Sequence, residues 1–195
     1  MHQRLRTRTS AQALVEFALA STVIFFLLAA VVDLGLIFFT MQALRVAAQE
    51  GANYGSYPKL SDTDTSDVYI DSPNIVNRIY NAAGDPPSGF ANLHDLNGNG
   101  QDDLNVDRLH DGMTADPNAY IYIENLKGFD PESLVPACRG NIPGQELQAG
   151  GRNCWIRVTV RYEYKFFFPF APAFGDTVRL EVSHLTPIRS TFYTN

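Results

Sequence analysis

A long apolar stretch near the N-terminus constrains this chain more than any other feature. No charge occurs from Ala18 to Val32, and the apolar character continues to Phe39. A helix rises about 1.5 Å per residue, so the segment from Val15 to Phe39 spans roughly 37 Å, enough to cross a hydrocarbon core of about 30 Å. We therefore expect one long helix over residues 12–56 that spans a membrane up to about residue 39.

A cleaved secretory signal is the main alternative, because Arg4, Arg6 and Arg8 precede the apolar run. The apolar core of a signal peptide has about 7 to 15 residues and ends in a small-residue cleavage site. The helical pattern here continues well past that length, which favours an anchor.

Two carboxylates are unusual for a plain anchor: Glu16 lies one turn into the apolar run, and Asp33 follows later in it. An ionised side chain in lipid is costly unless it is paired, so each acidic residue predicts a partner. For Asp33, a position at the outer interface and a pairing role both remain open.

The residues Gln12–Leu19, the apolar run after them, Asp33-Leu-Gly35 and residues 47–52 resemble the TadE-like family of tight-adherence pilus assembly proteins, which are minor pseudopilins. The resemblance covers roughly residues 10 to 56. It implies that a basic cytoplasmic leader, residues 1–11, is cut before Gln12, and that Glu16 pairs with the new amino group at Gln12 of a neighbouring subunit. Such leaders usually carry Gly where this chain has Ala11. The alternative for Glu16 is a carboxylate near the membrane boundary that is protonated or solvated by snorkelling.

Charge indicates orientation and compartment. The formal net charge is −6, and the first eleven residues hold three Arg and no acid, so the remainder carries 12 basic and 21 acidic residues, a balance of −9. That balance argues against nucleic acid as a partner. Basic residues flanking a membrane segment stay in the cytoplasm, so we expect a single-pass protein of the cytoplasmic (inner) membrane whose residues 57–195 form an exported domain.

Cys138 and Cys154 are the only cysteines. An even pair in an oxidising compartment predicts a disulfide, whose cross-link contributes about 3 kcal/mol. Free buried thiols are the alternative.

The exported residues predict an α+β domain in which the long N-terminal helix packs on a small antiparallel sheet of three or more strands. A short helix should start near Asp71 or Ser72, with Pro73 at its first position. Alternating residues rich in β-branched and aromatic side chains predict strands, at Ala119–Glu124, Cys154–Tyr164 and Thr177–Ser183. The segments Lys59–Asp71 and Lys127–Asn153 are predicted to be loops.

One acidic stretch, from His94 to Asp107, has the pattern of a calcium loop. A hard cation takes six to eight oxygens, and such a loop offers them at alternate positions before a turn-forming Gly, here Gly100. The stretch resembles the calcium loops of EF-hand and dockerin-like proteins, except that Val106 stands where a carboxylate would close the shell. The predicted ligands are Asp95, Asn97, Asn99, Gln101, Asp103 and Asp107. The alternative is an Asn/Gly-rich turn that uses these residues for its own backbone bonds.

A cluster of five Phe in nine residues, from Phe166 to Phe174, joins the second and third predicted strands. It predicts either core packing beneath the helix or an exposed docking patch for the membrane surface or a partner subunit.

The sequence has no GxSxG, HExxH or CxxC motif, and we expect a protein that is not an enzyme. The resemblance implies a minor pseudopilin that acts in assembly or structure of a tight-adherence (type IV-like) pilus, with membrane lipid and other pilus subunits as partners of its helix. The alternatives are a permanently anchored extracytoplasmic module that binds calcium or another ligand, and a filament-forming major subunit.

Overall fold

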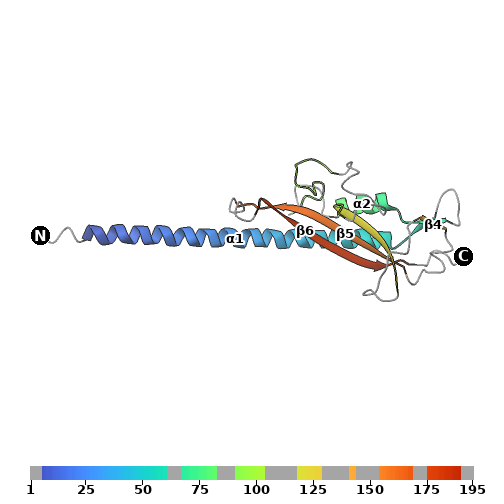
Figure 1. Cartoon of the computed structure of the whole chain (residues 1–195), viewed down its shortest axis with the longest axis horizontal. Helices are drawn as coiled ribbons and strands as arrows, with labels where there is room; N and C mark the ends of the chain where they lie inside the picture. Colours follow the sequence, from blue (N-terminus) through green and yellow to red (C-terminus); the bar gives the residue numbers. More distant parts are fainter. Residues whose placement is uncertain are drawn as a thin grey trace.

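The computed structural model of the chain describes residues 6–60, 67–82, 91–103, 118–128, 141–143, 154–168 and 175–189. A long helix, α1 (Arg6–Gly55), extends from the N-terminal end of the molecule into the domain, and the other elements gather around and beyond its C-terminal half (Figure 1). With a short second helix and an antiparallel sheet against α1, the predicted α+β class is confirmed.

The two ends of α1 have different surroundings. Residues 11–28 are exposed throughout, while a buried stripe begins at Ala29 and continues along one face of the helix to Gly55, with half-buried residues between Asp33 and Thr40. Most residues of that later stripe are small, which lets other elements approach the helix axis closely. Its members are Ala29, Asp33, Thr40, Leu44, Ala47, Ala48, Gly51, Ala52 and Gly55.

The main sheet contains the three predicted strands. They are β3 (Ile121–Lys127), β5 (Cys154–Lys165) and β6 (Thr177–Pro187), in the order β3-β5-β6 with antiparallel pairing throughout. Ile156, Val158 and Val160 of β5 are fully buried, as the alternation predicts. Thr159, on the other face, is also buried, and its hydroxyl lies 2.9 Å from that of Ser183 on β6.

A second small sheet lies in the two segments that were predicted to be loops. It pairs β1 (Lys59–Leu60), β2 (Asp67–Tyr69) and β4 (Asn141–Pro143) in the order β1-β2-β4. The loop prediction is therefore wrong at these residues. Strands of two or three residues are too short to show a period of two, and Val68 pairs with the distant Ile142.

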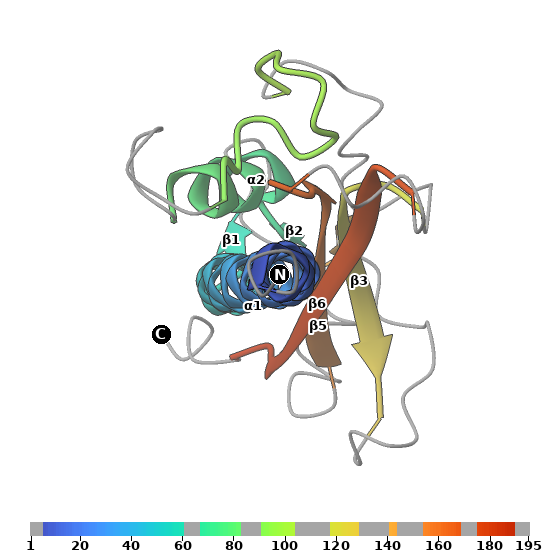
Figure 2. The same cartoon turned by 90° about the vertical axis from the view of Figure 1, so that its left-hand side faces the viewer.

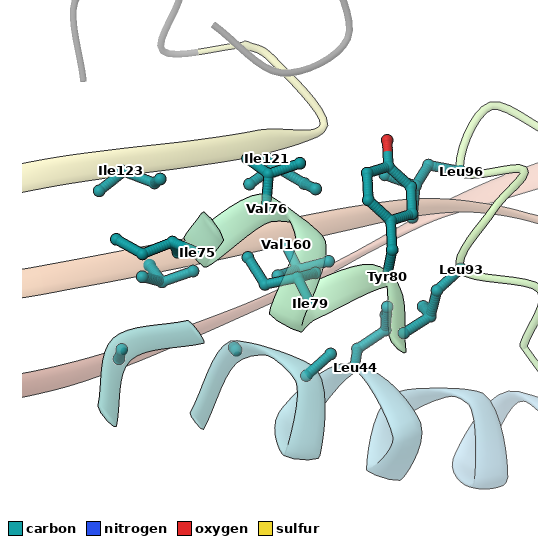
Figure 3. Close-up of a cluster of buried hydrophobic side chains, with 14 of the residues drawn as sticks. Leu44, Ile75, Val76, Ile79, Tyr80, Leu93, Leu96, Ile121, Ile123 and Val160 are labelled. Atoms are coloured by element: carbon teal, nitrogen blue, oxygen red, sulfur yellow. The ribbon is translucent and has the colours of Figure 1, made fainter. Parts of the chain in front are cut away.

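The helix α2 (Ser72–Asn81) begins as predicted. Asp71 is its N-cap and accepts a 3.3 Å bond from the Asn74 amide, and Pro73 lies in the first turn. In Figure 2, which looks along α1 from its N-terminus, α2 and the β3-β5-β6 sheet lie on two different sides of α1. The core fills the space where the three meet: Leu44 of α1 faces Ile79 and Tyr80 of α2, with Val160 of β5 close by (Figure 3).

Glycines make this close packing possible. A Cβ added at Gly51 would lie 2.7 Å from Cγ1 of the fully buried Ile79, and one at Gly55 would overlap Ile156. Glycine commonly ends a helix, but α1 continues four residues beyond Gly51. The residue serves the contact between α1 and α2.

Candidate functional site

Glu16 and Gln12 lie on the exposed first part of α1, where no other element of the described chain covers them. The Gln12 side-chain amide donates a 3.0 Å hydrogen bond to Oε1 of Glu16, one turn further along the helix. Pairing of Glu16 with the amino group of a neighbouring subunit involves a second chain, so it stays a prediction.

Asp33 differs from Glu16, because it has partners within the chain. Its side chain is buried (8% exposed) although α1 is exposed on both sides of it. Its carboxylate accepts hydrogen bonds from the backbone amides of Phe167 at 2.9 Å and Phe168 at 3.4 Å, just beyond the end of β5. The carboxylate thus holds the turn after β5 against the long helix.

Tyr164, the last buried residue of β5, adds a third bond to this group. Its hydroxyl donates to Oδ1 of Asp33 at 3.3 Å. Burial raises the pKa of Tyr164 to about 12, and the negative charge of Asp33 acts in the same direction. The phenol therefore stays neutral, and remains a donor, throughout the physiological pH range.

The described Phe residues of the cluster divide between core packing and exposure, and docking by the exposed one stays a prediction. Phe166 packs edge-on against Tyr164 at 5.8 Å and contributes to the core. Phe168 packs edge-on against Phe25 of α1, with ring centroids 6.5 Å apart, whereas Phe167 is 72% exposed. Core packing and exposure thus both occur within three consecutive residues. Residues 169–174 lie outside the described chain.

The acidic loop is held together by its own side chains. The Asp95 carboxylate accepts bonds from the amides of Asn99 at 2.9 Å and Gly100 at 2.8 Å. The side-chain oxygens of Asn97 and Asn99 each accept from the amide two residues later, at 2.9 Å and 2.7 Å. Gly98 and Gly100 adopt φ values of 70° and 83°, which suit glycine. The bonds that the turn alternative requires are therefore present.

Asp103 has a different position from the other predicted ligands. It is fully buried, and its two oxygens accept bonds from the Leu96 amide at 2.8 Å and the Asn97 side-chain amide at 2.9 Å. A cation at Asp103 would have to displace or share these bonds. Among the described residues, no group of three or more His, Cys, Asp and Glu could hold a metal ion, and Asp107 lies outside them. Calcium binding stays a prediction.

The loop also contributes to the core, which the sequence analysis missed. Leu93 and Leu96 are almost completely buried, and the Leu96 carbonyl accepts a 2.8 Å bond from the Glu163 amide of β5. The two leucines occur among Asp, Asn and Gly residues and show no period, so their burial could be suspected only from their apolar character.

Cys154 is buried at the first residue of β5, 1% exposed. Cys138 lies outside the described residues, so the disulfide between them stays a prediction.

Comparison with known proteins identifies the part of the chain that surrounds Glu16 and Asp33. A family model described as TadE-like protein matches residues 11–53. Searches of curated proteins and of solved structures gave no significant match. The match lies within the helix Ala11–Gly55, which is long and apolar enough to cross a membrane, and little of its most apolar stretch is buried within the chain. The long N-terminal helix is thus a TadE-like segment, and the family resemblance predicted from the residues around Glu16 is confirmed over residues 11–53.

Proposed function

We propose that this protein is a membrane-anchored minor pseudopilin that acts in the assembly or structure of a tight-adherence, type IV-like pilus. The observation that carries the proposal is the continuous exposure of residues 11–28 within a segment that matches the TadE-like model. An apolar helix that its own domain leaves uncovered needs lipid or the helices of other subunits around it. The TadE-like family is not an enzyme family, and the proposal assigns the chain no catalysis.

In this proposal α1 anchors the chain in the cytoplasmic membrane, and the domain around its C-terminal half is extracytoplasmic. Large apolar side chains project in every direction from the uncovered part, including Leu14 (69% exposed), Phe17 (72%) and Leu27 (62%). These side chains provide contacts first to lipid and, in a filament, to neighbouring helices. Glu16 is exposed on the same part of α1, which leaves it accessible to the Gln12 amino group of another subunit after cleavage.

The proposal is tested by following the protein into sheared surface filaments. We expect mature protein beginning at Gln12 when the host has its prepilin peptidase, and an intact leader when it does not. Glu16→Gln should leave the protein in the membrane fraction, because the charge that pairs with the amino group is lost. Glu50→Gln is the matched control, since Glu50 is an exposed acidic residue of the same helix.

Two outcomes would overturn parts of this proposal. Protein that retains Met1 in both hosts and stays with the membranes would indicate the permanently anchored module. Filaments that consist mainly of this chain would indicate a major subunit.

Calcium binding by the acidic loop is a separate proposal. It is supported by the fold of the loop, which brings the side chains of Asp95, Asn97 and Asn99 onto one turn. Titration calorimetry of the full chain in detergent should give binding heat with calcium that Asp95→Ala removes. Absence of heat with millimolar calcium would identify a turn that is stabilised only by its own bonds.

A further inference from the structure

The charge-free run of α1 is shorter than the hydrocarbon core of a bilayer is thick. The uncharged run between Glu16 and Asp33 comprises residues 17–32, 16 residues, which at about 1.5 Å each reach roughly 24 Å, short of a hydrocarbon core of about 30 Å. Continuing to Phe39 supplies the missing length, but it also brings Asp33 inside the apolar layer. The protein part that covers Asp33 must then lie in that layer too.

The burial and hydrogen bonds of Asp33 suit a position within the apolar layer. A carboxylate within a membrane faces protein and is paired there. Asp33 is 8% exposed, and its oxygens accept from the Phe167 amide, the Phe168 amide and the Tyr164 hydroxyl. Without Asp33, the two amides of this turn would need water as their hydrogen-bond acceptor. One interaction therefore satisfies both the carboxylate and the backbone of the hairpin tip, which we define as Phe166–Phe168.

The side chains of the hairpin tip continue the apolar surface of α1. Phe168 touches Phe25, which is itself 59% exposed and lies within the charge-free run. Phe167 stacks edge-on with Phe168 at 5.1 Å and is 72% exposed. In Figure 1 the C-terminal end of β5 and the start of β6 reach further along α1 toward the N-terminus than the other labelled strands. The exposed Phe therefore lies beside the part of the helix that is proposed to contact lipid.

A charged residue lies at the base of the same tip. Lys165, the last residue of β5, is exposed and directly precedes Phe166. Lysine at a membrane boundary keeps its ammonium group among the headgroups while its stem lies along apolar groups. The order of a cation followed by aromatic residues fits an entry into the lipid layer.

We propose that the hairpin tip is immersed in the outer leaflet, with Phe167 and Phe168 among the acyl chains beside α1 and Asp33 fixing the tip to the helix. The protein then contacts the acyl chains through two adjacent segments, α1 and the hairpin tip. This inference rests on the proposed role of α1 as a membrane anchor.

Tryptophan quenching by brominated lipid tests the immersion. The full chain is reconstituted at low protein density in phosphatidylcholine vesicles whose acyl chains carry bromine, and compared with unbrominated vesicles. Three variants add one Trp each: Phe167→Trp at the tip, Leu27→Trp on the uncovered helix, and Gln49→Trp on an exposed position beside the domain. The native Trp155, far along β5 from the tip, provides the same background in all three.

We expect Phe167→Trp to lose emission to an extent similar to Leu27→Trp, while Gln49→Trp and the wild type lose little. If Leu27→Trp is quenched and Phe167→Trp is not, the anchor stands and the immersed tip is overturned. If Leu27→Trp is not quenched either, the anchor itself fails. A blue-shifted but unquenched Phe167→Trp would indicate that a second copy of the chain covers the tip, which also overturns the lipid assignment.

Discussion

The two parts of α1 belong to one unbroken helix but are built for different surroundings. Residues 11–28 carry large apolar side chains on every side, and all are exposed. Residues 29–55 bury a single stripe, in which Ala47, Ala48, Gly51 and Ala52 are small enough for α2 and the sheet to approach. A helix surrounded by lipid needs apolar groups all round, whereas a helix against one domain needs them on one face. The difference shows that burial of α1 against the domain begins at Ala29, within the apolar run, while Phe25 makes an earlier ring contact with Phe168.

The largest effect is expected from truncating the same residue type in the two parts. Leu44 is fully buried between α1 and α2, whereas Leu27 is 62% exposed. Leu44→Ala should lower the free energy of unfolding of the domain by about 2–5 kcal/mol, because it removes buried methyl groups and leaves a cavity. Leu27→Ala should change it by less than about 0.5 kcal/mol. Urea unfolding in detergent, followed by Trp155 fluorescence, measures both. Equal losses would show that the uncovered part also packs on the domain.

Removing the Asp33 carboxylate tests the contact that joins the two parts. Asp33→Ala leaves the Phe167 and Phe168 amides and the Tyr164 hydroxyl without their acceptor. We expect a loss of about 1–3 kcal/mol and faster hydrogen exchange at the two Phe amides. Glu50→Ala, which removes an exposed carboxylate from the same helix, is the control. Unchanged exchange at Phe167 would contradict the contact.

Two glycines of α1 differ in the space around them: Gly51 is closely packed and Gly35 is open. A Cβ at Gly51 would press on Ile79, whereas one at Gly35 would meet nothing within 4 Å. Gly51→Ala should destabilise the domain by about 1–2 kcal/mol, because overpacking outweighs the gain in helix propensity. Gly35→Ala should be neutral or stabilising by up to about 1 kcal/mol. Thermal unfolding of the two variants gives the comparison, and a destabilised Gly35→Ala would show that lipid or protein closely approaches that face.

The smallest effect concerns Tyr164. Tyr164→Phe should cost about 0.5–1.5 kcal/mol at neutral pH, because its hydrogen bond to Asp33 is lost. The pKa of Tyr164 is raised from about 10 to about 12 in the folded state, so its contribution to stability is complete below pH 10 and is lost as pH rises from 10 to 12. The stability difference between wild type and Tyr164→Phe should therefore shrink over that interval. Urea unfolding at several pH values measures it, and a constant difference would show that the phenol does not ionise there.

Local sequence patterns predicted those helices and strands whose own residues show a clear periodicity or a helix start. The run around Val32 predicted α1, the alternation from Cys154 to Tyr164 predicted β5, and Asp71 with Pro73 predicted the start of α2. Each of these depends on neighbouring residues, and the structure contains each of them.

Contacts between distant residues were not predictable in this way. Asp33 and Phe167 are separated by 134 positions, and nothing near either residue indicates the other. The pairing of Val68 with Ile142 joins strands too short to show alternation. At the acidic loop, the residue types of a calcium site and of an Asx turn are the same, so Asp95 and Asn97 could not distinguish the two from sequence. The burial of Asp103 depends on Leu96 and Tyr80, which approach it only in the folded domain.

Because α1 is one continuous helix from Arg6 to Gly55, it links the exposed N-terminal part directly to the domain. Each residue of an α-helix turns the chain by about 100° and advances it by about 1.5 Å. The direction in which Gly51 and Gly55 face α2 and the sheet therefore also determines the direction in which Glu16 points, some ten turns away. A domain attached in this manner cannot rotate about the helix axis independently of the N-terminal contacts. The direction in which Glu16 contacts a neighbour therefore sets the orientation of the domain around the helix axis.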